Sequence, residues 1–537
     1  MTLSTGLIFG IIFILMFIVV MATISEGLVK IAAKHQGQNP ENYGVLPNDL
    51  PSMLNRGEGS PNYVSQGDHF VDLKKGFDIN LLGAASLEHG IEQVHASTYA
   101  LKPKDFMGMM PIPKVVVEEG GTLKAGDVLF YDKKRPEIKY AAPVSGEMLK
   151  IQRGDKRSIN EVVILADKEI EYREYNLPDL NTVSREDLVA FLLDSGAWPF
   201  IRQRPFDIVA EHEQLPKSIF VTTFDTAPLA PSFNLTVQGK EAEFQKGLDV
   251  LAKLTEGGVH LGLDGRGTSS PSEAFSNATG VQKHWFNGPH PAGNVGIHMH
   301  HVDPLNSGET IWHLDVHGVL VIGTLFAKGI FDTERVIALT GYEMTNPRYV
   351  KARQGICIEK FVTDIKFQEQ TATTDKEGKP VNINRKAVRL ISGDPLTGKE
   401  IEPNGYLGFF DDQMMTVEEG DYYELFGWLI PRAGHPTQNR TFPGAFAPSA
   451  VYKADTQQNG EHRAFVVSGE YESVLPMDIY PQYLLRAIQA NDFEKMEGLG
   501  ILELGEEDVA LCEYVCTSKH PVQKTLRQGL DMLREQG

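Results

Sequence analysis

Residues 114–154, KVVVEEGGTLKAGDVLFYDKKRPEIKYAAPVSGEMLKIQRG, decide the fold of the first globular part of the chain. Short runs of Val, Leu and Ile alternate there with turn sequences at Gly120-Gly121, Ala125-Gly126-Asp127 and Pro143-Val144-Ser145-Gly146. Branched apolar residues favour strands, and Gly, Pro, Asp and Ser favour the turns between them. The stretch therefore predicts a compact structure of short antiparallel strands.

The same stretch resembles the barrel-sandwich hybrid of lipoyl and biotinyl carrier domains, which read EGDxVxxGDxL, a hairpin, and then APxxGxV. The matching residues are Glu119, Gly120, Thr122, Leu123, Gly126, Asp127, Leu129, Ala142, Pro143, Gly146 and Met148. Carrier domains present a modified lysine at the hairpin tip. The tip here, residues 132–136 (DKKRP), lacks the acidic and small residues that flank a lipoyl-lysine. We interpret it as the fold without the prosthetic group.

Pattern and composition divide the chain into six segments. We expect a membrane helix over 1–26, a linker or strap over 27–69, the barrel-sandwich hybrid over 70–170, an α/β domain over 171–330, a β-rich domain over 331–440 and a C-terminal region with a helical bundle over 441–537. In the α/β domain, an amphipathic helix at 241–258 separates apolar strands at 217–225 and 259–265. This βαβ pattern predicts a parallel sheet. No G-x-G-x-x-G follows these strands, so the dinucleotide fingerprint is missing.

The first 25 residues carry no charged side chain, and Leu7 to Ile24 reads LIFGIIFILMFIVVMATI. Such a run is long enough to cross a hydrocarbon core of about 30 Å. A signal peptide fits less well because no basic residue precedes the run, and a buried core helix fits less well because it would show a polar face. Lys30 and Lys34 follow the helix, which predicts an outside amino terminus and a cytoplasmic body.

Bulk composition limits the chemistry. The formal charge of −20 argues against a nucleic-acid partner. Three cysteines, Cys357, Cys512 and Cys516, suit a reducing compartment and exclude a four-cysteine iron–sulfur cluster within this chain. Cys512 and Cys516 are spaced i, i+4 on a predicted helix. We interpret them as buried thiols in preference to a metal or redox pair.

Two patterns resemble ligand sites. Residues 393–399 (GDPLTGK) have the spacing of a phosphate-binding loop, but Glu400 replaces the Ser or Thr that would hold magnesium, so we predict a hairpin turn. A histidine-rich stretch contains His284, His290, His298, His300, His301, His313 and His317. Its spacing matches no known metal motif, so we assign no metal and interpret the histidines as packed or hydrogen-bonded.

Eight segments, in this order, resemble the A subunit of the sodium-translocating NADH:quinone reductase (Na⁺-NQR). They are 74–85 (KKGFDINLLGAA), the AAPVSG turn, 195–206 (SGAWPFIRQRPF), 220–231 (FVTTFDTAPLAP), 288–301 (GPHPAGNVGIHMHH), 406–410 (YLGFF), 424–428 (ELFGW) and 499–516 (LGILELGEEDVALCEYVC). The resemblance runs from about Val71 to the carboxyl terminus. Family members begin near the KKGFDI segment, so the amino-terminal membrane helix is a departure from the family.

The resemblance implies a multidomain α/β architecture: a Rossmann-like domain at 171–330, a β-grasp domain of the soluble-ligand-binding type at 331–440 and a C-terminal helical bundle. It implies a location on the cytoplasmic side of the bacterial inner membrane, docked on other subunits of the complex and mainly on its membrane-embedded B subunit. NADH, flavins, iron centres and Na⁺ belong to those subunits, this chain binds no redox cofactor, and ubiquinone is the substrate of the complex.

The resemblance links this subunit to quinone binding, which requires aromatic faces and hydrogen-bond donors to the carbonyl oxygens. Candidate residues lie in one short segment: Trp198, Phe200, Arg202, Arg204 and Phe206. The alternative is an aromatic–arginine cluster that only joins domains. A second functional hypothesis is a structural adaptor of a related, RNF-like electron-transfer complex without quinone contact.

Overall fold

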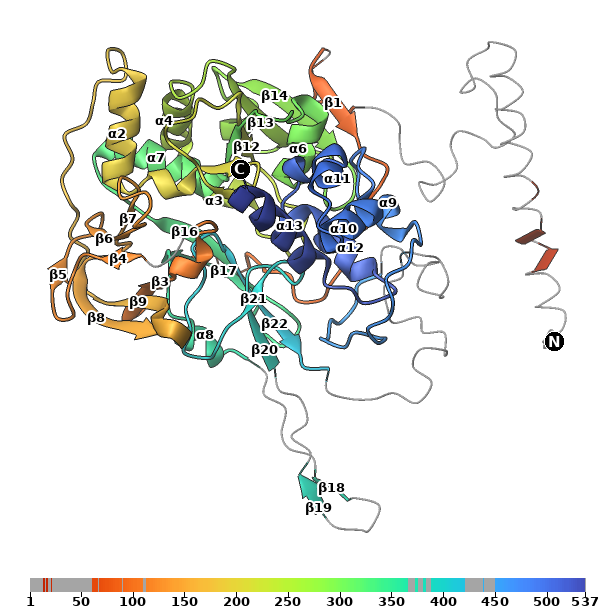
Figure 1. Cartoon of the computed structure of the whole chain (residues 1–537). Coiled ribbons are helices and arrows are strands. Elements are labelled where there is room, and N and C mark those ends of the chain that lie inside the picture. Colours follow the sequence, from red (N-terminus) through yellow and green to blue (C-terminus); the bar gives the residue numbers. More distant parts are fainter. Residues whose placement is uncertain are drawn as a thin grey trace. The chain divides into compact units, whose positions relative to one another are not determined.

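The structure, a computed structural model, describes residues 60–365 apart from 66, 89 and 110–112, and residues 388–420 and 450–536. Elsewhere it describes two paired short strands, β18 (Ala372–Thr374) and β19 (Pro380–Asn382), and a few single positions. The chain divides into two compact units, Met1–Pro61 and Asn62–Gly537. The second unit contains the labelled sheets and the helices from α2 onward in Figure 1.

The predicted membrane helix over residues 1–26 lies almost wholly outside the described residues, as does most of the predicted linker over 27–69. The described positions within the helix are helical and exposed: Phe13, Ile14, Met16, Phe17 and Met21. Among the residues that the structure describes, no helix is long and apolar enough to cross a bilayer.

The predicted barrel-sandwich hybrid is confirmed as two small antiparallel sheets that share one apolar core. Their strand orders are β3 (Thr98–Leu101), β9 (Ile159–Ala166), β8 (Gly146–Arg153), β5 (Thr122–Leu123), and β4 (Lys114–Val115), β6 (Val128–Tyr131), β7 (Lys139–Ala141). Gly146 has a φ of 150°, and a Cβ there would lie 2.0 Å from the Leu165 carbonyl oxygen. The AAPVSG turn therefore needs a glycine at this position.

The hairpin tip between β6 and β7 is fixed against the neighbouring domain. Asp132 is buried, and its carboxylate accepts hydrogen bonds from the Lys134 backbone nitrogen at 3.0 Å and from Arg135 Nε at 3.2 Å. Arg135 Nη1 also donates to the Val209 carbonyl at 3.2 Å, in β11 (Ile208–Val209). A carrier lysine must swing freely, whereas Arg135 ties this hairpin tip to the neighbouring domain.

A seven-stranded sheet forms the core of the predicted α/β domain. Its order is β1 (His69–Asp72), β14 (Gln282–Asn287), β13 (Val259–Asp264), β12 (Ile219–Thr222), β15 (Ile311–Leu314), β10 (Arg202–Arg204) and β11, and the first five strands are parallel. Helices α2 (Arg185–Ser195), α4 (Glu241–Leu251), α6 (Val295–Val302) and α7 (Val316–Lys328) belong to the same domain. The predicted βαβ unit is thus confirmed as β12, α4 and β13.

Helices α4 and α7 pack closely because each carries a glycine at the crossing. A Cβ on Gly323 would lie 1.8 Å from the Glu243 carbonyl oxygen, and one on Gly247 would lie 2.3 Å from that of Val319. Two backbones in such contact leave no room for a methyl group between them.

A third sheet has the order β2 (Glu92–Gln93), β17 (Arg348–Arg353), β16 (Glu334–Thr340), β22 (Gln413–Glu418), β20 (Val388–Ser392), β21 (Lys399–Glu400), with β16 and β22 parallel. The short helix α8 (Glu359–Val362) follows β17. Residues 393–398 connect the antiparallel strands β20 and β21, and Asp394 accepts hydrogen bonds from the backbone nitrogens of Leu396 and Thr397. The predicted hairpin turn is therefore confirmed.

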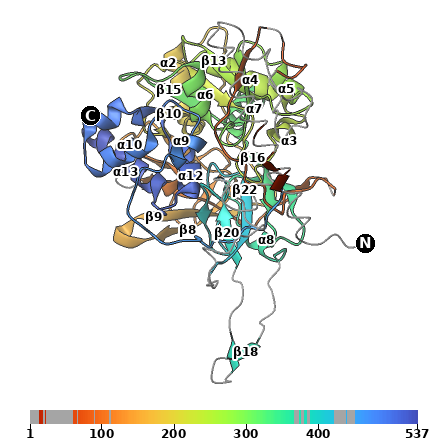
Figure 2. The ribbon, with the colours of Figure 1, turned by 90° about the vertical axis from the view of Figure 1, so that its right-hand side faces the viewer.

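The described part of the carboxyl-terminal region after residue 469 is helical, as predicted. It comprises α9 (Glu470–Val474), α10 (Pro481–Gln489), α11 (Phe493–Gly498), α12 (Glu506–Val515) and α13 (Val522–Gln536), which share one apolar core (Figures 1 and 2). Cys512 and Cys516 are buried free thiols in this core, and the Tyr471 hydroxyl donates to Cys516 Sγ at 2.9 Å. Burial raises the pKa of the Cys512 thiol well above its usual range.

Gly323→Ala tests the close crossing of α4 and α7. The new methyl must push the helices apart, and we expect a loss of about 1–3 kcal/mol in the free energy of unfolding. Gly498→Ala is the matched control, because a Cβ added there would meet nothing within 4 Å and alanine favours the helix. Urea titration should show a lower midpoint for Gly323→Ala and an unchanged or higher one for Gly498→Ala; equal midpoints would contradict the packing argument.

Candidate functional site

A cleft of about 580 Å³ opens at the carboxyl ends of β12 and β15. From β12 the chain proceeds to β13 and β14 on one side of the sheet and then crosses to β15 on the other. The strand order therefore reverses between β12 and β15, and open α/β sheets bind ligands at such a reversal. We call this the switch-point cleft.

Four parts of the second unit line the switch-point cleft. They are the barrel-sandwich hybrid (Asp105, Met107), the α/β domain (Arg202, Asp207, Val209, Thr222, Phe224, Asp225, Ala227, Phe233, His290, Gly293, Asn294, Val295, His313, Leu314, Asp315), the third sheet and its loops (Gly393, Asp394, Leu396, Thr397, Lys399, Phe410, Asp411, Asp412, Gln413) and the C-terminal helices (Glu506, Glu507, Gln523, Lys524, Arg527, Gln528). The cleft thus exists only when these parts are assembled.

Carboxyl groups dominate the charge of the cleft: nine Asp and Glu line it against four Lys and Arg. Burial raises the pKa of Asp225 to about 7. Burial and then Asp315 raise the pKa of Asp412 to about 8, and burial followed by Asp508 raises that of Glu507 to about 7. Near neutral pH these groups are partly or largely protonated, so they can donate a hydrogen bond as well as accept one.

One wall of the cleft rests on a buried arginine. Arg204 is fully buried, and its guanidinium pairs with Asp207 at 2.5 Å, Glu507 at 3.3 Å and Asp508 at 3.4 Å. Burial alone would raise the pKa of Asp207, but Arg204 and Arg202 hold it well below its usual range. His313 Nε2 lies 3.0 Å from Asp207 Oδ1, and burial lowers the pKa of this imidazole to about 3. Asp207 is therefore ionised, and it holds the side chains of Arg202, Arg204 and His313 around it.

The five predicted quinone residues do not converge on one point. Arg202 lines the cleft, with its guanidinium carbon 4.8 Å from the centre of the Phe410 ring. Trp198 is buried elsewhere, where its Nε1 donates to the Ala210 carbonyl at 2.8 Å. Phe200 packs on Phe409 at 4.8 Å between ring centres.

The other two of the five residues are not among those that line the switch-point cleft. Arg204 is fully enclosed behind the wall, and Phe206 packs against the apolar core of the C-terminal helices. Sequence reasoning missed Asp225 and Asp315, although both follow closely after apolar strands whose carboxyl ends meet at one edge.

The histidine-rich stretch is dispersed over several contacts. His298 and His301 bond the carbonyls of Ala292 and Pro476, and His290 bonds the hydroxyl of Thr226. His300 and His313 bond the carboxylates of Glu503 and Asp207, whereas His317 Nε2 lies 3.3 Å from Asp412 without a hydrogen bond. Within the described ranges, no group of three or more His, Cys, Asp or Glu side chains is placed to hold a metal ion.

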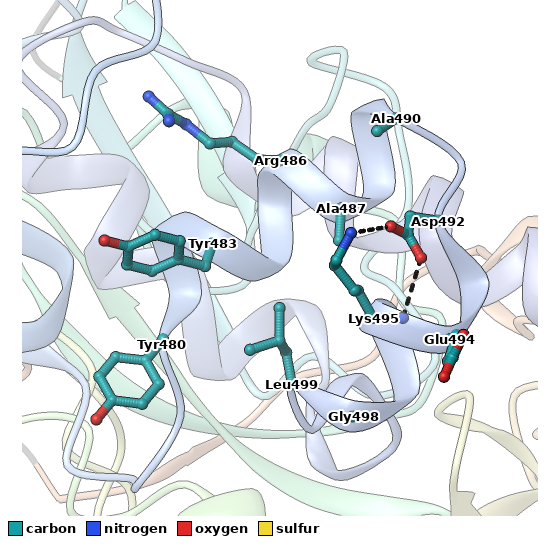
Figure 3. A pocket seen from close by; sticks show the side chains of 10 residues that line it. All are labelled: Tyr480, Tyr483, Arg486, Ala487, Ala490, Asp492, Glu494, Lys495, Gly498 and Leu499. Carbon is teal, nitrogen blue, oxygen red and sulfur yellow. Dashed lines mark hydrogen bonds and ion pairs between the residues drawn. The ribbon is translucent and has the colours of Figure 1, made fainter.

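A second, wider groove lies on α10 and α11 (Figure 3). Tyr480 and Tyr483 are about half exposed there, at 57% and 52%. Asp492 accepts hydrogen bonds from both the backbone and the side chain of Lys495, so this charged pair is satisfied within the chain. The switch-point cleft gathers far more titratable groups and is the candidate functional site.

The buried imidazoles give stability a specific pH dependence. His298 is 1% exposed, and burial lowers its pKa from 6.5 to about 3. Its contribution is thus fully present above pH 6.5 and is lost as the pH falls, because the unfolded chain takes up a proton that the folded chain does not. Relative to His298→Phe, the wild-type free energy of unfolding should fall by up to about 1.4 kcal/mol per pH unit between pH 6 and 4.

Urea titrations of both chains at several pH values measure this difference. The exposed His95 provides the matched control, because His95→Phe should track the wild type at every pH. Parallel stability curves for wild type and His298→Phe would show that the His298 imidazole does not titrate as its burial requires.

Two family models match the chain: the NqrA N-terminal barrel-sandwich hybrid domain over residues 71–167 and the NqrA second alpha/beta domain over residues 183–331. Among solved structures, an NAD⁺-reducing [NiFe]-hydrogenase in its air-oxidized state overlaps 68% of this chain and 67% of its own. Its TM-score is 0.30 at 11% identity, a likeness too slight for any structural argument.

Curated relatives match over their whole length. The A subunit of the Na(+)-translocating NADH-quinone reductase of Serratia proteamaculans is 36% identical over 474 residues, which cover 87% of this chain and 100% of that protein. The corresponding protein of Neisseria meningitidis serogroup B, which bears the same name, is 37% identical over 471 residues with the same coverage. With the domain matches and the ordered segments, this shows that the chain belongs to the NqrA family, the A subunits of Na⁺-translocating NADH-quinone reductases.

Proposed function

We propose that this chain works as the A subunit of a sodium-pumping NADH:ubiquinone oxidoreductase. The observation that carries the proposal is the match over 100% of the length of the curated relatives, because it includes every segment from the barrel-sandwich hybrid to the C-terminal helices. In this role the chain is a peripheral subunit on the cytoplasmic side of the inner membrane. It docks on the other subunits, mainly the membrane-embedded B subunit, and NADH oxidation and sodium transport take place on those partners.

We infer that the chain itself carries no redox cofactor. The switch-point cleft supports this inference: even with Asp225, Asp412 and Glu507 protonated, the other carboxylates outnumber its four cations, so the cleft offers no net positive charge to the phosphates of a flavin nucleotide or NADH. The three cysteines are buried thiols, and the hairpin tip of the barrel-sandwich hybrid is tied to β11. The chain is then a binding and assembly subunit of the enzyme.

The switch-point cleft suits the headgroup of a quinone, which is an uncharged aromatic ring with two hydrogen-bond acceptors. Phe224, Phe233 and Phe410 supply apolar faces, and Arg202 supplies a donor that favours the negative charge gained on reduction. Protonated Asp225 and Asp412 are further donors. The competing function, a structural adaptor of an RNF-like complex, needs no such donors.

We propose that residues 331–440 form a β-grasp domain and that a C-terminal bundle follows it. The order of the third sheet supports this, because the parallel pair β16 and β22 lies at its centre, with β17 antiparallel to β16 on one side and β20 antiparallel to β22 on the other. We also propose that residues 1–26 form a single-pass anchor with the amino terminus outside, on the basis of the uncharged run and the following Lys30 and Lys34.

Arg202→Gln tests the quinone function within the whole complex. Loss of one charged donor costs about 1.5–3 kcal/mol, so kcat/KM for quinone should fall roughly tenfold or more. Oxidation of NADH by an artificial acceptor should not change, because that chemistry belongs to another subunit. Normal quinone kinetics in an assembled Arg202→Gln complex would favour the structural adaptor.

Arg204→Gln provides the contrast for that experiment. It leaves the buried Asp207 and Asp508 and the partly exposed Glu507 short of their cation, and removing one partner of a buried ion pair costs about 3–5 kcal/mol. We expect the subunit to be lost from the purified complex, with assembly restored in part by Arg204→Lys. A stable Arg204→Gln complex with a purely kinetic quinone defect would place Arg204 at the ligand.

Deletion of residues 1–30 tests the anchor. Expressed without its partner subunits, the full chain should sediment with membranes, and the truncated chain should move to the soluble fraction, because a single apolar helix suffices for membrane insertion. Protease added outside intact spheroplasts should leave the body of the full chain intact. Retention of the truncated chain on membranes would contradict the proposed anchor. Digestion of the body by protease from outside would contradict the proposed orientation.

A further inference from the structure

Three histidines form a continuous hydrogen-bonded row across the edge of the α/β sheet. They lie on the adjacent strands β1, β14 and β13: His69 stands opposite His284 in the β1–β14 register, and His284 stands opposite Gly262 in the β14–β13 register. His69 Nδ1 lies 3.0 Å from His284 Nδ1, and His284 Nε2 lies 2.9 Å from His260 Nδ1. His69 is exposed, whereas His284 and His260 are buried.

Each ring nitrogen of His284 thus has one histidine nitrogen within hydrogen-bond distance. A neutral imidazole has one N–H donor and one lone pair, so when Nε2–H donates to His260, the Nδ1 lone pair points at His69. A hydrogen bond to the far nitrogen is what orients most metal-binding imidazoles.

The separation of the two Nδ1 atoms fits two ligands of one metal ion. With metal–nitrogen distances of about 2.0–2.1 Å, nitrogens 3.0 Å apart subtend an angle of about 91–97°. This is the angle between neighbouring ligands in octahedral or square geometry, and a tetrahedral ion would need the pair to open to about 3.4 Å. Imidazole is a preferred ligand of Zn²⁺, Ni²⁺ and Cu²⁺.

We propose that His69 and His284 form a two-imidazole site for a divalent transition-metal ion of this kind, with His260 as the positioning residue. No third protein ligand is placed among the described residues, so water completes the coordination shell. The metal replaces the single proton that the two Nδ1 atoms share, but it lies to one side of the line between them, so both rings must turn to direct their lone pairs at it. It links β1, a four-residue strand at the edge of the sheet, to β14.

Metal binding at this site stabilises the pairing of β1 with β14. Strand β1 joins the sheet through one neighbour alone, β14, and its remaining edge is unpaired in the described sheet. A ligand that bridges β1 and β14 binds only while the strands are paired and therefore stabilises that pairing by mass action.

Calorimetric titration of the untagged full chain with Ni²⁺ and with Zn²⁺ at pH 7.5 tests the proposal. We expect one saturable site at micromolar metal, with affinity reduced at least tenfold in both His69→Gln and His284→Gln. His95→Gln, which removes an exposed imidazole outside the row, should bind like the wild type. His69 is exposed, so His69→Gln should fold normally, and circular dichroism verifies this.

His260→Phe distinguishes the positioning role from simple ligation. The phenyl ring retains the stacking on Phe220, now 4.7 Å between ring centres, but removes the acceptor for His284. Metal affinity should fall severalfold while stoichiometry stays at one. Absence of saturable binding by the wild type, or equal affinities for wild type, His69→Gln and His284→Gln, would overturn the site; an unchanged affinity in His260→Phe would overturn the positioning role.

Discussion

Arg204 is the contact on which the assembly of the body depends. A guanidinium with no exposed surface is tolerable only when carboxylates and hydrogen bonds replace the water that it has lost. Asp207, from the turn after β10, supplies one carboxylate, and Glu507 and Asp508, from the first turn of α12, supply two more. The acids of α12 need the arginine as much as it needs them, so the α/β domain and the C-terminal helices are stable together. Arg527 reinforces the junction by binding Glu506 and the Phe206 carbonyl.

The same junction decides the electrostatics of the switch-point cleft. Asp207 and Glu507 both line it, but only Asp207 is held ionised by arginine, whereas burial leaves Glu507 with a raised pKa. Carboxyl groups that are removed from water and crowded by like charges take up protons near neutral pH. A cleft built in this way offers hydrogen-bond donors without a strong positive field. The proposed quinone function depends on this charge pattern.

Local patterns predicted much of the fold. The turn glycines of residues 114–154 and the apolar strands β12 and β13 appear where periodicity placed them, because each depends on residues close in sequence. Helix α4 begins at Glu241 as predicted but ends at Leu251, short of the predicted end at 258. The candidate site was predicted less well. Residues 198–206 are adjacent in sequence, but the chain makes a 3-10 turn at Trp198–Phe200 and then enters the sheet as β10, so Trp198 and Phe200 point into the core. The cleft combines residues more than 400 positions apart in the sequence, such as Asp105 and Arg527. No local sequence pattern predicts that such residues lie together.

Similarity to the family describes the whole chain better than it describes any single domain. Neither family model extends beyond residue 331. The cleft also needs Asp411 and Asp412 from the third sheet and Glu506 and Glu507 from α12. An isolated α/β domain would keep β12 and β15 but lose these walls and their charge. Its strand ends would then be open to water, and Asp225 would ionise as an ordinary carboxyl group does. The ligand chemistry of this sheet is thus a property of the assembled body, which explains how an α/β domain without a dinucleotide fingerprint can still carry a specific cleft.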